Sequence, residues 1–284
     1  MNDLILLLNR AGAAAMAFAG PAFLQSAVLI AVVAVLDLLL RRRAPAAVRA
    51  ALWLLVLVKL ALPPSLALPT GLGYWLHRPD ARPAAGAFAP AVFLEANSAL
   101  LPSPPAAPSP RPAPRLRVEA WLLAAWAAGT LALAGVTFAQ WLRVRRLVRS
   151  ARPATPELII RLERAAKRLG LRRAVRLRLT DSPHGPLVFG LFRPVILLPE
   201  QLVAELTADQ LGDVLLHELA HVRRGDLWIG HAQALLQILW WWHPLVWLAG
   251  RRLDRAREEA ADEAVVGALE REPQRYAETL VAVA

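Results

Sequence analysis

The sequence predicts a mainly α-helical membrane protein, with three membrane-spanning helices in its N-terminal half and an α+β domain with a small sheet after them. Two observations lead to this fold class. Hydrophobic residues make up 57% of the 284 residues and charged residues only 19%, with a mean hydropathy of +0.41, and such a composition is unusual for a soluble domain. From about residue 153, amphipathic and alternating patterns replace the long apolar runs, which indicates a folded domain outside the lipid.

The first two predicted spans lie within residues 1–66. Residues 11–36 carry no charge, and a bilayer needs only about 20 apolar residues, so we expect a membrane helix over about 11–40. A second, shorter apolar run over 46–66 contains Arg49 and Lys59. We expect these two side chains at the inner and outer membrane boundaries, although Lys59 could instead act inside the membrane.

The third predicted span covers residues 118–142, and a loop over 67–117 precedes it. This loop is rich in proline and alanine and shows no hydrophobic period, so we expect it to be external, extended and largely disordered. Arginine clusters follow the first and the third span. Because basic residues stay in the cytoplasm, the N-terminus is predicted outside and residues 143–284 inside, in a multi-pass membrane protein.

The charge and the absence of cysteine narrow the functional classes. The net charge of +11 comes almost entirely from arginine, and the clusters flank the predicted spans. We therefore expect contacts with membrane lipids and no direct binding of nucleic acid. A chain without cysteine has no disulfide and no thiolate metal site, so any metal must be held by His, Asp or Glu.

The domain over 143–284 is predicted to contain amphipathic helices and a small sheet. Residues 156–169 place apolar side chains at helical spacing, 175–180 alternates like a strand, and 187–199 is typical of two short strands. One of these strands could lie at a sheet edge and pair with a substrate peptide, or it could be purely structural. Thr207 and Gln210 form a capping box that begins the next helix.

That helix carries the sequence HELAH. His217 and His221 are four residues apart and therefore lie on one helical face, where two imidazoles can bind one zinc ion. Glu218 lies beside them and can act as the catalytic general base on a water molecule. The alternative is a buried structural helix whose histidines have ordinary hydrogen-bond partners.

Catalytic zinc usually takes a third protein ligand, and the predicted helix over 251–265 offers one. Glu258 can complete the site, while Glu259 faces about a quarter-turn away. Asp262 lies one turn beyond Glu258 and can accept the remaining N–H of a ligand histidine. Asp226 could do the same for the other histidine, or could cap a helix.

Residues 227–250 are long and apolar enough to cross a membrane, but a crossing would separate Glu258 from the two histidines. Polar residues such as Gln233, Gln237 and His243 interrupt the run, and each is unfavourable in lipid. We therefore expect a re-entrant or interfacial helical hairpin that dips into the membrane, with its tryptophans at the headgroups. His231 and His243 are expected to be polar anchors and not additional ligands.

Taken together, these motifs resemble the BlaR/MecR family of integral-membrane zinc metallopeptidases. The matching stretches are PLVFGLFRPVILLP at 186–199, HELAHVRRGD at 217–226, WWHPLVW at 241–247 and REEAADEAV at 257–265. The resemblance implies a zincin-like fold and a gluzincin endopeptidase that binds Zn²⁺ through His217, His221 and Glu258. It also implies transmembrane signalling in which the enzyme cuts itself or a cytoplasmic protein, with a BlaI/MecI-type repressor as the expected partner.

The sequence departs from the antibiotic-sensing members of that family. It contains no Ser-x-x-Lys motif of a penicillin-binding sensor domain, so a β-lactam signal is not expected, and the chain could be a fragment. Two other functions stay open: a membrane quality-control protease of the HtpX/Ste24 type and a non-catalytic signalling scaffold. Tyr276, His243 and Arg223 are candidates for the residue that stabilises the transition state, and spacing favours none of them. The oligomeric state is not indicated.

Overall fold

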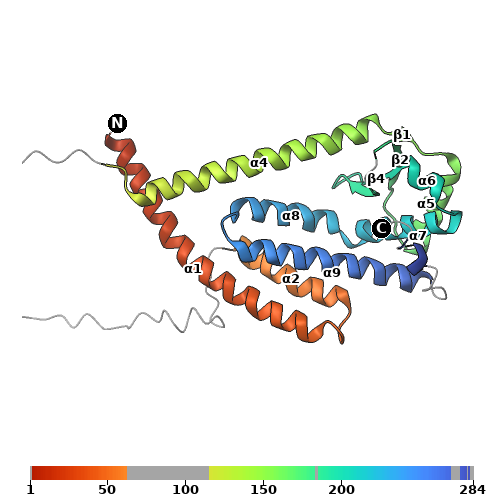
Figure 1. Ribbon diagram of the computed structural model, residues 1–284, viewed down its shortest axis with the longest axis horizontal. Helices are drawn as coiled ribbons and strands as arrows, with labels where there is room; N and C mark the ends of the chain where they lie inside the picture. The colour runs from red at the N-terminus through yellow and green to blue at the C-terminus, as the bar shows by residue number, and fades with distance from the viewer. Residues whose placement is uncertain (1, 63–114, 183–184, 270–275, 280, 282–284) are drawn as a thin grey trace, which may run out of the picture. The chain divides into compact units, whose positions relative to one another are not determined.

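The computed structural model describes residues 2–62, 115–182, 185–269, 276–279 and 281 (Figure 1). The described chain is mostly helical, with one small mixed sheet. It forms two compact units, one of residues 1–19 with 64–123 and the other of residues 20–63 with 124–284. The predicted external loop over 67–117 lies outside the described residues, apart from its last three positions.

In the first unit, the start of helix α1 (Asn2–Leu40) packs against the start of helix α4 (Val118–Ser150). The Asn9 side chain donates to the carbonyl of Arg115 and accepts from the N–H of Arg117, both at 2.9 Å. A Cβ at Gly12 would lie 2.5 Å from the backbone of Glu119. The absence of a side chain at Gly12 therefore permits this close approach.

Within the described residues, α1 and α4 are the two helices long and apolar enough to cross a membrane. Both extend beyond the predicted spans, because residues 2–10 and 143–150 contain no residue that breaks a helix. The second predicted span, 46–66, corresponds to helix α2 (Ala46–Ala61). With 16 residues, α2 is shorter than the roughly 20 residues that a span needs, so the structure shows two helices of spanning length where three spans were predicted.

The sheet has four strands in the order β1-β2-β4-β3. Strands β2 (Arg176–Thr180) and β4 (Val195–Pro199) pair in parallel, and β3 (Leu187–Phe189) pairs antiparallel with β4. All three were predicted, whereas β1 (Arg152–Pro153), two residues antiparallel to β2, was not. Since β3 is bonded to β4 alone, it is an edge strand among the described residues.

Two of the helices around the sheet begin at residues whose side chains cap the first turn. Helix α5 (Pro156–Arg168) starts at Thr155, whose side chain accepts from the N–H of Leu158. A short helix α6 (Glu200–Glu205) leads to α7 (Ala208–Arg224), which begins with the predicted capping box of Thr207 and Gln210. Gly225 ends α7 with φ +75°, a conformation that favours glycine, and α8 (Asp226–Leu239) begins directly after it.

Helices α8 and α9 (Pro244–Leu269) form a hairpin that turns at residues 240–243. Gln233 Nε2 donates to Asp254 Oδ2 at 3.1 Å, and a Cβ at Gly250 would lie 2.2 Å from Gln237 Nε2. These two pairs show that the helices run antiparallel and pack closely at the glycine. Gln233 and Gln237, two of the polar residues that interrupt the apolar run, therefore face the partner helix.

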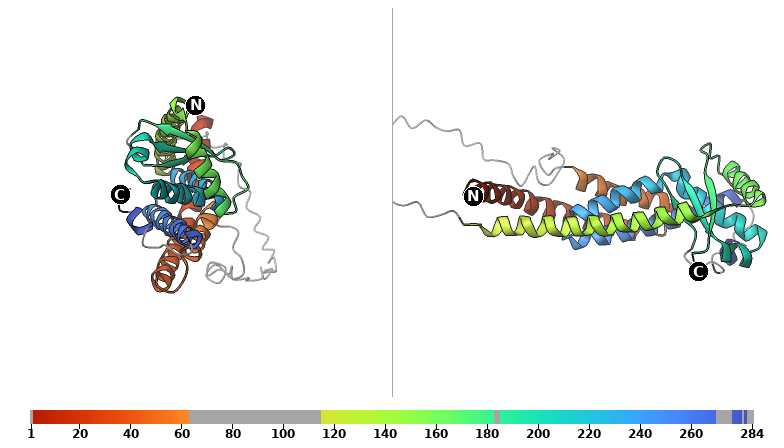
Figure 2. Two further views of the ribbon diagram at one scale, coloured as in Figure 1. Left: turned by 90° about the vertical axis from the view of Figure 1, so that its right-hand side faces the viewer. Right: turned by 90° about the horizontal axis from the view of Figure 1, so that it is seen from above.

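Two hydrophobic cores organise the second unit. The sheet-side core joins α5, α7 and the strands β2 and β4 with the end of α9, as shown by Leu162, Ile196, Leu215 and Val265. The hairpin-side core joins α1, α2, α8 and the first half of α9, with Trp53 as its largest fully buried member. Figure 2 shows α2 and α9 side by side from two further directions, and no other pair of described helices has a more extensive contact.

Candidate metal centre

The predicted ligand side chains lie together at the face of α7 that meets α9. His217 Nε2 and His221 Nε2 are 3.2 Å apart, one helical turn from each other. Glu258 of α9 places Oε2 3.4 Å from His217 Nε2 and 3.5 Å from His221 Nε2. Two helices from distant parts of the sequence thus bring three metal-binding atoms into one nearly equilateral triangle.

The dimensions of this triangle fit a zinc ion. In a tetrahedral site with metal–ligand distances of about 2.0–2.1 Å, neighbouring donor atoms are about 3.3 Å apart. The three observed separations, 3.2, 3.4 and 3.5 Å, lie around that value. Two nitrogens and one carboxylate oxygen are also the donor types that zinc accepts.

The other ring nitrogen of His217 is held by two side chains. Nδ1 lies 3.1 Å from Asp262 Oδ1 and 3.0 Å from the Tyr276 hydroxyl, which itself donates to Asp262 at 2.7 Å. Both neighbours therefore accept the Nδ1–H of His217. In the neutral imidazole the proton is therefore held on Nδ1, and Nε2 is free to bind a metal.

The other ring nitrogen of His221 is held in the same way by Asp226, at the start of α8. His221 Nδ1 lies 2.8 Å from Asp226 Oδ2. The Asp226 side chain is almost fully buried, and Arg224 and Arg257 approach it at 3.5 Å each. Arg257 also donates to the backbone carbonyl of Asp226 at 3.0 Å. This carboxylate can accept the Nδ1–H of His221 and so keep its Nε2 free for a metal.

The contact from Arg257 was not predicted from the sequence. Arg257 precedes Glu258, and its partner Asp226 is 31 residues away. Neither a motif nor helical spacing connects the two positions, so no local signal could have identified the pair.

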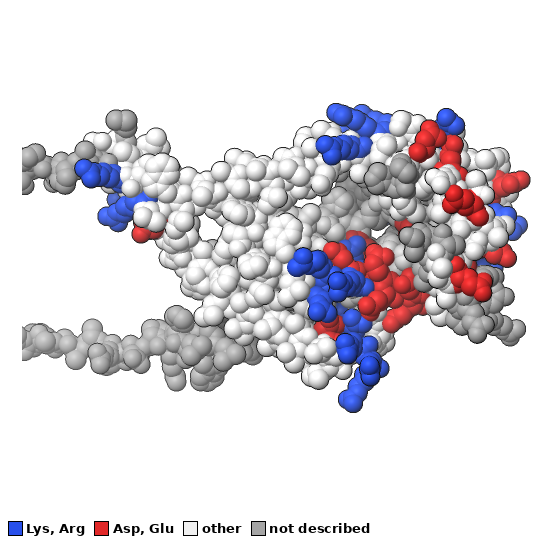
Figure 3. Space-filling model, viewed as in Figure 1, with Lys and Arg blue, Asp and Glu red and all other residues white. Residues whose placement is uncertain are grey.

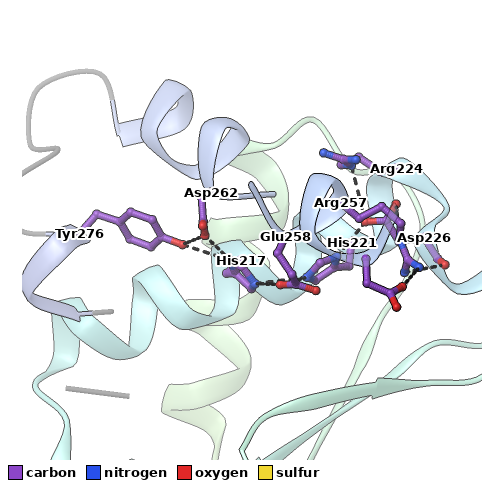
Figure 4. A network of polar contacts seen from close by, with 9 residues as sticks. His217, His221, Arg224, Asp226, Arg257, Glu258, Asp262 and Tyr276 are labelled. Carbon is purple, nitrogen blue, oxygen red and sulfur yellow. Dashed lines mark hydrogen bonds and ion pairs between the residues drawn. The ribbon is translucent and has the colours of Figure 1, made fainter. Parts of the chain in front are cut away.

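Figure 4 shows these side chains in a row, from Tyr276 and Asp262 through His217, Glu258 and His221 to Asp226. Carboxylates and imidazoles alternate along it, and this sets the charges of the site. Burial alone would lower the pKa of His217, but Asp262 and Glu258 outweigh it and raise the pKa to about 10. For His221, Asp226 and Glu258 likewise outweigh burial and raise the pKa to about 9.

The two glutamates at the site have opposite shifts. The hydrogen bonds from His217 and His221 hold the pKa of Glu258 far below its usual value, so it stays an anionic donor. Burial raises the pKa of Glu218, against the two histidines that lower it. A carboxylate with a raised pKa can hold a proton and release it again, as a general base requires.

The other predicted candidates lie elsewhere. The Tyr276 hydroxyl is on the Nδ1 side of His217, away from the donor triangle. His243 is fully buried and bonds Ser26 of α1 at 3.0 Å. His231 is exposed and contacts the carbonyl of Leu227 in its own helix at 2.7 Å, and Arg223 is exposed on α7. These contacts bring none of the four to the donor triangle.

Comparison with known proteins shows the family of the chain. Residues 17–284 match the family described as BlaR1 peptidase M56. Among curated proteins, the chain is 28% identical to "Regulatory protein BlaR1" of Bacillus licheniformis over 58% of this chain and 28% of that protein. It is 28% identical to "Methicillin resistance mecR1 protein" of Staphylococcus aureus and of Staphylococcus epidermidis, over 36% of this chain and 18% of each relative. The matched segments thus span less than a third of the length of these relatives.

Proposed function

The chain belongs to the BlaR1 peptidase M56 family, and on that premise we propose that it is a membrane-embedded, zinc-dependent endopeptidase. The observation that carries the proposal is the donor triangle of His217, His221 and Glu258. Its edges of 3.2–3.5 Å fit tetrahedral zinc, and acceptors on both Nδ1 atoms leave the Nε2 lone pairs directed at one point.

The residues around the donor triangle would have different roles in peptide hydrolysis. Zinc, when bound, acts as a Lewis acid on the peptide carbonyl and lowers the pKa of water. Glu218 takes the proton of the attacking water as the C–O bond forms, and passes it to the leaving amine as the C–N bond breaks. Asp262 and Asp226 hold the two imidazoles in the tautomer that leaves Nε2 unprotonated.

We further propose that the enzyme works at the cytoplasmic face of the bacterial inner membrane. Helices α1 and α4 would cross the bilayer and α2 would complete the three-span arrangement, with 67–117 outside and 143–284 inside. The α8–α9 hairpin would dip into the lipid. Outward-facing apolar side chains on α2 and α8 support this, because Leu55 is 56% and Leu235 is 58% exposed.

The proposed substrate is a cytoplasmic protein that controls gene expression, such as a BlaI/MecI-type repressor, or the chain itself. The names of the relatives, a regulatory protein and a methicillin-resistance protein, support a regulatory role. Within the described residues β3 pairs with β4 alone, so an extended substrate peptide could form hydrogen bonds along its other edge.

The experiment compares metal content and cleavage in the full chain, purified in detergent. We expect about one zinc per chain and cleavage of a BlaI/MecI-type repressor, with fluorescently labelled casein as a general protease probe. Glu218→Gln should keep zinc and lose cleavage at least about 10³-fold, because the proton acceptor is gone. His217→Ala should lose stoichiometric zinc.

His231→Ala is the matched control, since this exposed histidine contacts only its own helix in the described structure. It should keep both zinc and cleavage. A native chain that purifies without zinc, or a Glu218→Gln variant that cleaves normally, would contradict the proposal.

A further inference from the structure

We infer that helix α2 and Arg49 position the metal ligand Glu258, so that the N-terminal helical pair α1–α2 is part of the support of the metal centre. This inference rests on the proposed function and extends it to residues outside the peptidase motif. It starts from the two faces of a single stretch of α9, residues 258–263.

One face of this stretch points to the metal centre. Glu258 faces His217 and His221, and Asp262, one turn later, faces His217. The residues that directly follow them, Glu259 and Glu263, point to the other side and contact α2. Glu258 and Asp262 are therefore each followed by a carboxylate that contacts α2.

Arg49 of α2 makes the first of these connections. Its Nε donates to Asp37 Oδ1 near the end of α1 at 2.7 Å, and its Nη1 forms an ion pair with Glu259. The side chains of Arg49 and Asp37 are only 12% and 6% exposed, whereas that of Glu259 is 50% exposed. The planar guanidinium thus connects three helices, and its inner half is fixed by a buried pair.

Glu263 makes the second connection, at the first residue of α2. Both of its carboxylate oxygens lie within hydrogen-bond distance of Ala46 N, at 2.9 and 3.0 Å. Pro45, which precedes the helix, provides no side-chain cap. The free N–H at the start of α2 is therefore capped by a side chain from α9, where the helix dipole favours an anion.

Packing between the two connections leaves α9 little freedom to move against α2. Ala46 and Ala50 of α2 are buried, as are Ala256 and Ala260 of α9, and small side chains allow two helices to approach closely. The position and rotation of α9 about its axis are thereby set by α2, and they decide where Glu258 lies. Metal ligands tolerate displacements of only a few tenths of an ångström.

The test measures the metal centre itself in the full chain, with the double variant Glu259→Ala/Glu263→Ala. Zinc affinity is measured by competition with a chelator, and coordination geometry by the visible absorption of the cobalt(II)-substituted protein. We expect zinc affinity to fall about 10-fold, the low end of the effect of residues that support ligands. We also expect the cobalt spectrum to change, because Glu258 is held less well.

A second variant, Arg49→Lys, covers the case in which the double variant does not fold. Lysine keeps a positive charge beside the buried Asp37 but lacks the fork that reaches Asp37 and Glu259 together. It should show the same spectral change, with a smaller loss of affinity. Arg42→Ala, at an exposed arginine between α1 and α2, is the matched control and should leave both readouts unchanged.

The outcomes separate this inference from the proposed function. If the unmodified chain binds zinc, but every folded variant keeps its affinity within about twofold and its cobalt spectrum, α2 has only a structural role and the inference is wrong. If the unmodified chain itself binds no zinc, the proposed function fails first. A lower melting temperature with an unchanged spectrum also counts against the inference.

Discussion

The sheet-side core and the hairpin-side core have similar interior residues, but the helices around them have different outer surfaces. Both interiors consist mainly of leucine, valine, isoleucine and alanine. On α5, beside the sheet-side core, most outward positions are charged, among them Glu163, Arg164 and Lys167. On α2 and α8, beside the hairpin-side core, the outward positions include Leu55, Val58 and Leu235. The outer surface, and not the interior, therefore distinguishes the two regions, as is expected if α2 and α8 face lipid and α5 faces water.

Helix α9 belongs to both regions. Its first half, to Ala256, lies in the hairpin-side core, and Ala261 and Val265 lie in the sheet-side core. Glu258 falls between the two. Figure 3 shows charged residues of both signs gathered next to each other in the middle of the face that it draws. The candidate metal ligand Glu258 thus lies within the charged part of α9, which begins at Arg251 after an uncharged start.

The largest expected effect comes from placing a charge on each outer surface. Leu235→Arg on α8 should destabilise the membrane-inserted protein by about 2.5–3.5 kcal/mol, because an arginine is unfavourable in lipid. Ile160→Arg on α5 is the matched variant, since Leu235 is 58% exposed and Ile160 is 49% exposed. It should change stability by less than about 0.5 kcal/mol. Thermal unfolding in lipid nanodiscs and the yield in the membrane fraction measure both. Equal effects would mean that α8 does not face lipid.

The next effect concerns the donor triangle, which lies between the two cores and where protons and metal compete for the same histidine nitrogens. Carboxylates raise the pKa of His217 to about 10 and that of His221 to about 9, so at pH 7 the metal-free site holds at least one proton that zinc must displace. Zinc affinity should therefore fall at least about 10-fold, or 1.4 kcal/mol, for each unit that the pH falls below 9. Chelator competition between pH 6 and 9 measures this, and calorimetry in buffers of different ionisation enthalpy counts the released protons. An affinity independent of pH would refute these raised pKa values.

The smallest effect compares two helical glycines, one beside each core. A Cβ at Gly250 in α9 would lie 2.2 Å from Gln237 Nε2, whereas a Cβ at Gly212 in α7 would meet nothing within 4 Å. We expect Gly250→Ala to destabilise the protein by about 1 kcal/mol, since the glutamine must move. Gly212→Ala should stabilise it by about 0.5–1 kcal/mol through helix propensity. Chemical denaturation of the two variants gives the comparison, and stabilisation by both would mean that the hairpin is packed more loosely than the structure shows.

Much of the fold could be predicted because its signals are local. The strands at 176–180 and 195–199 follow alternation and apolar runs, and the start of α7 follows from Thr207 and Gln210. The hairpin of α8 and α9 was predicted from the requirement that Glu258 reach the two histidines. The start of α1 and the end of α4 were less predictable, because neither helix contains a helix-breaking residue at that boundary of its predicted span.

The candidate site could be predicted only as far as side-chain periodicity reaches. His217 and His221 are one turn apart in the sequence, and so are Glu258 and Asp262. The bonds from Arg257 to Asp226 and from Arg49 to Glu259 connect residues 31 and 210 positions apart. Such pairs depend on how helices pack, and a single sequence carries no pattern for that.

Helix α9 continues without interruption from Pro244 in the hairpin turn to the metal ligand and beyond. At 1.5 Å per residue, Glu258 lies about 21 Å along the helix axis from that turn. Because α9 packs on α2 over this length, the two helices must tilt together, and a tilt of only about 5° at the turn would move Glu258 by about 2 Å, the length of a zinc–oxygen bond. A small bend of the whole hairpin-side core would thus be enough to make or break one metal bond.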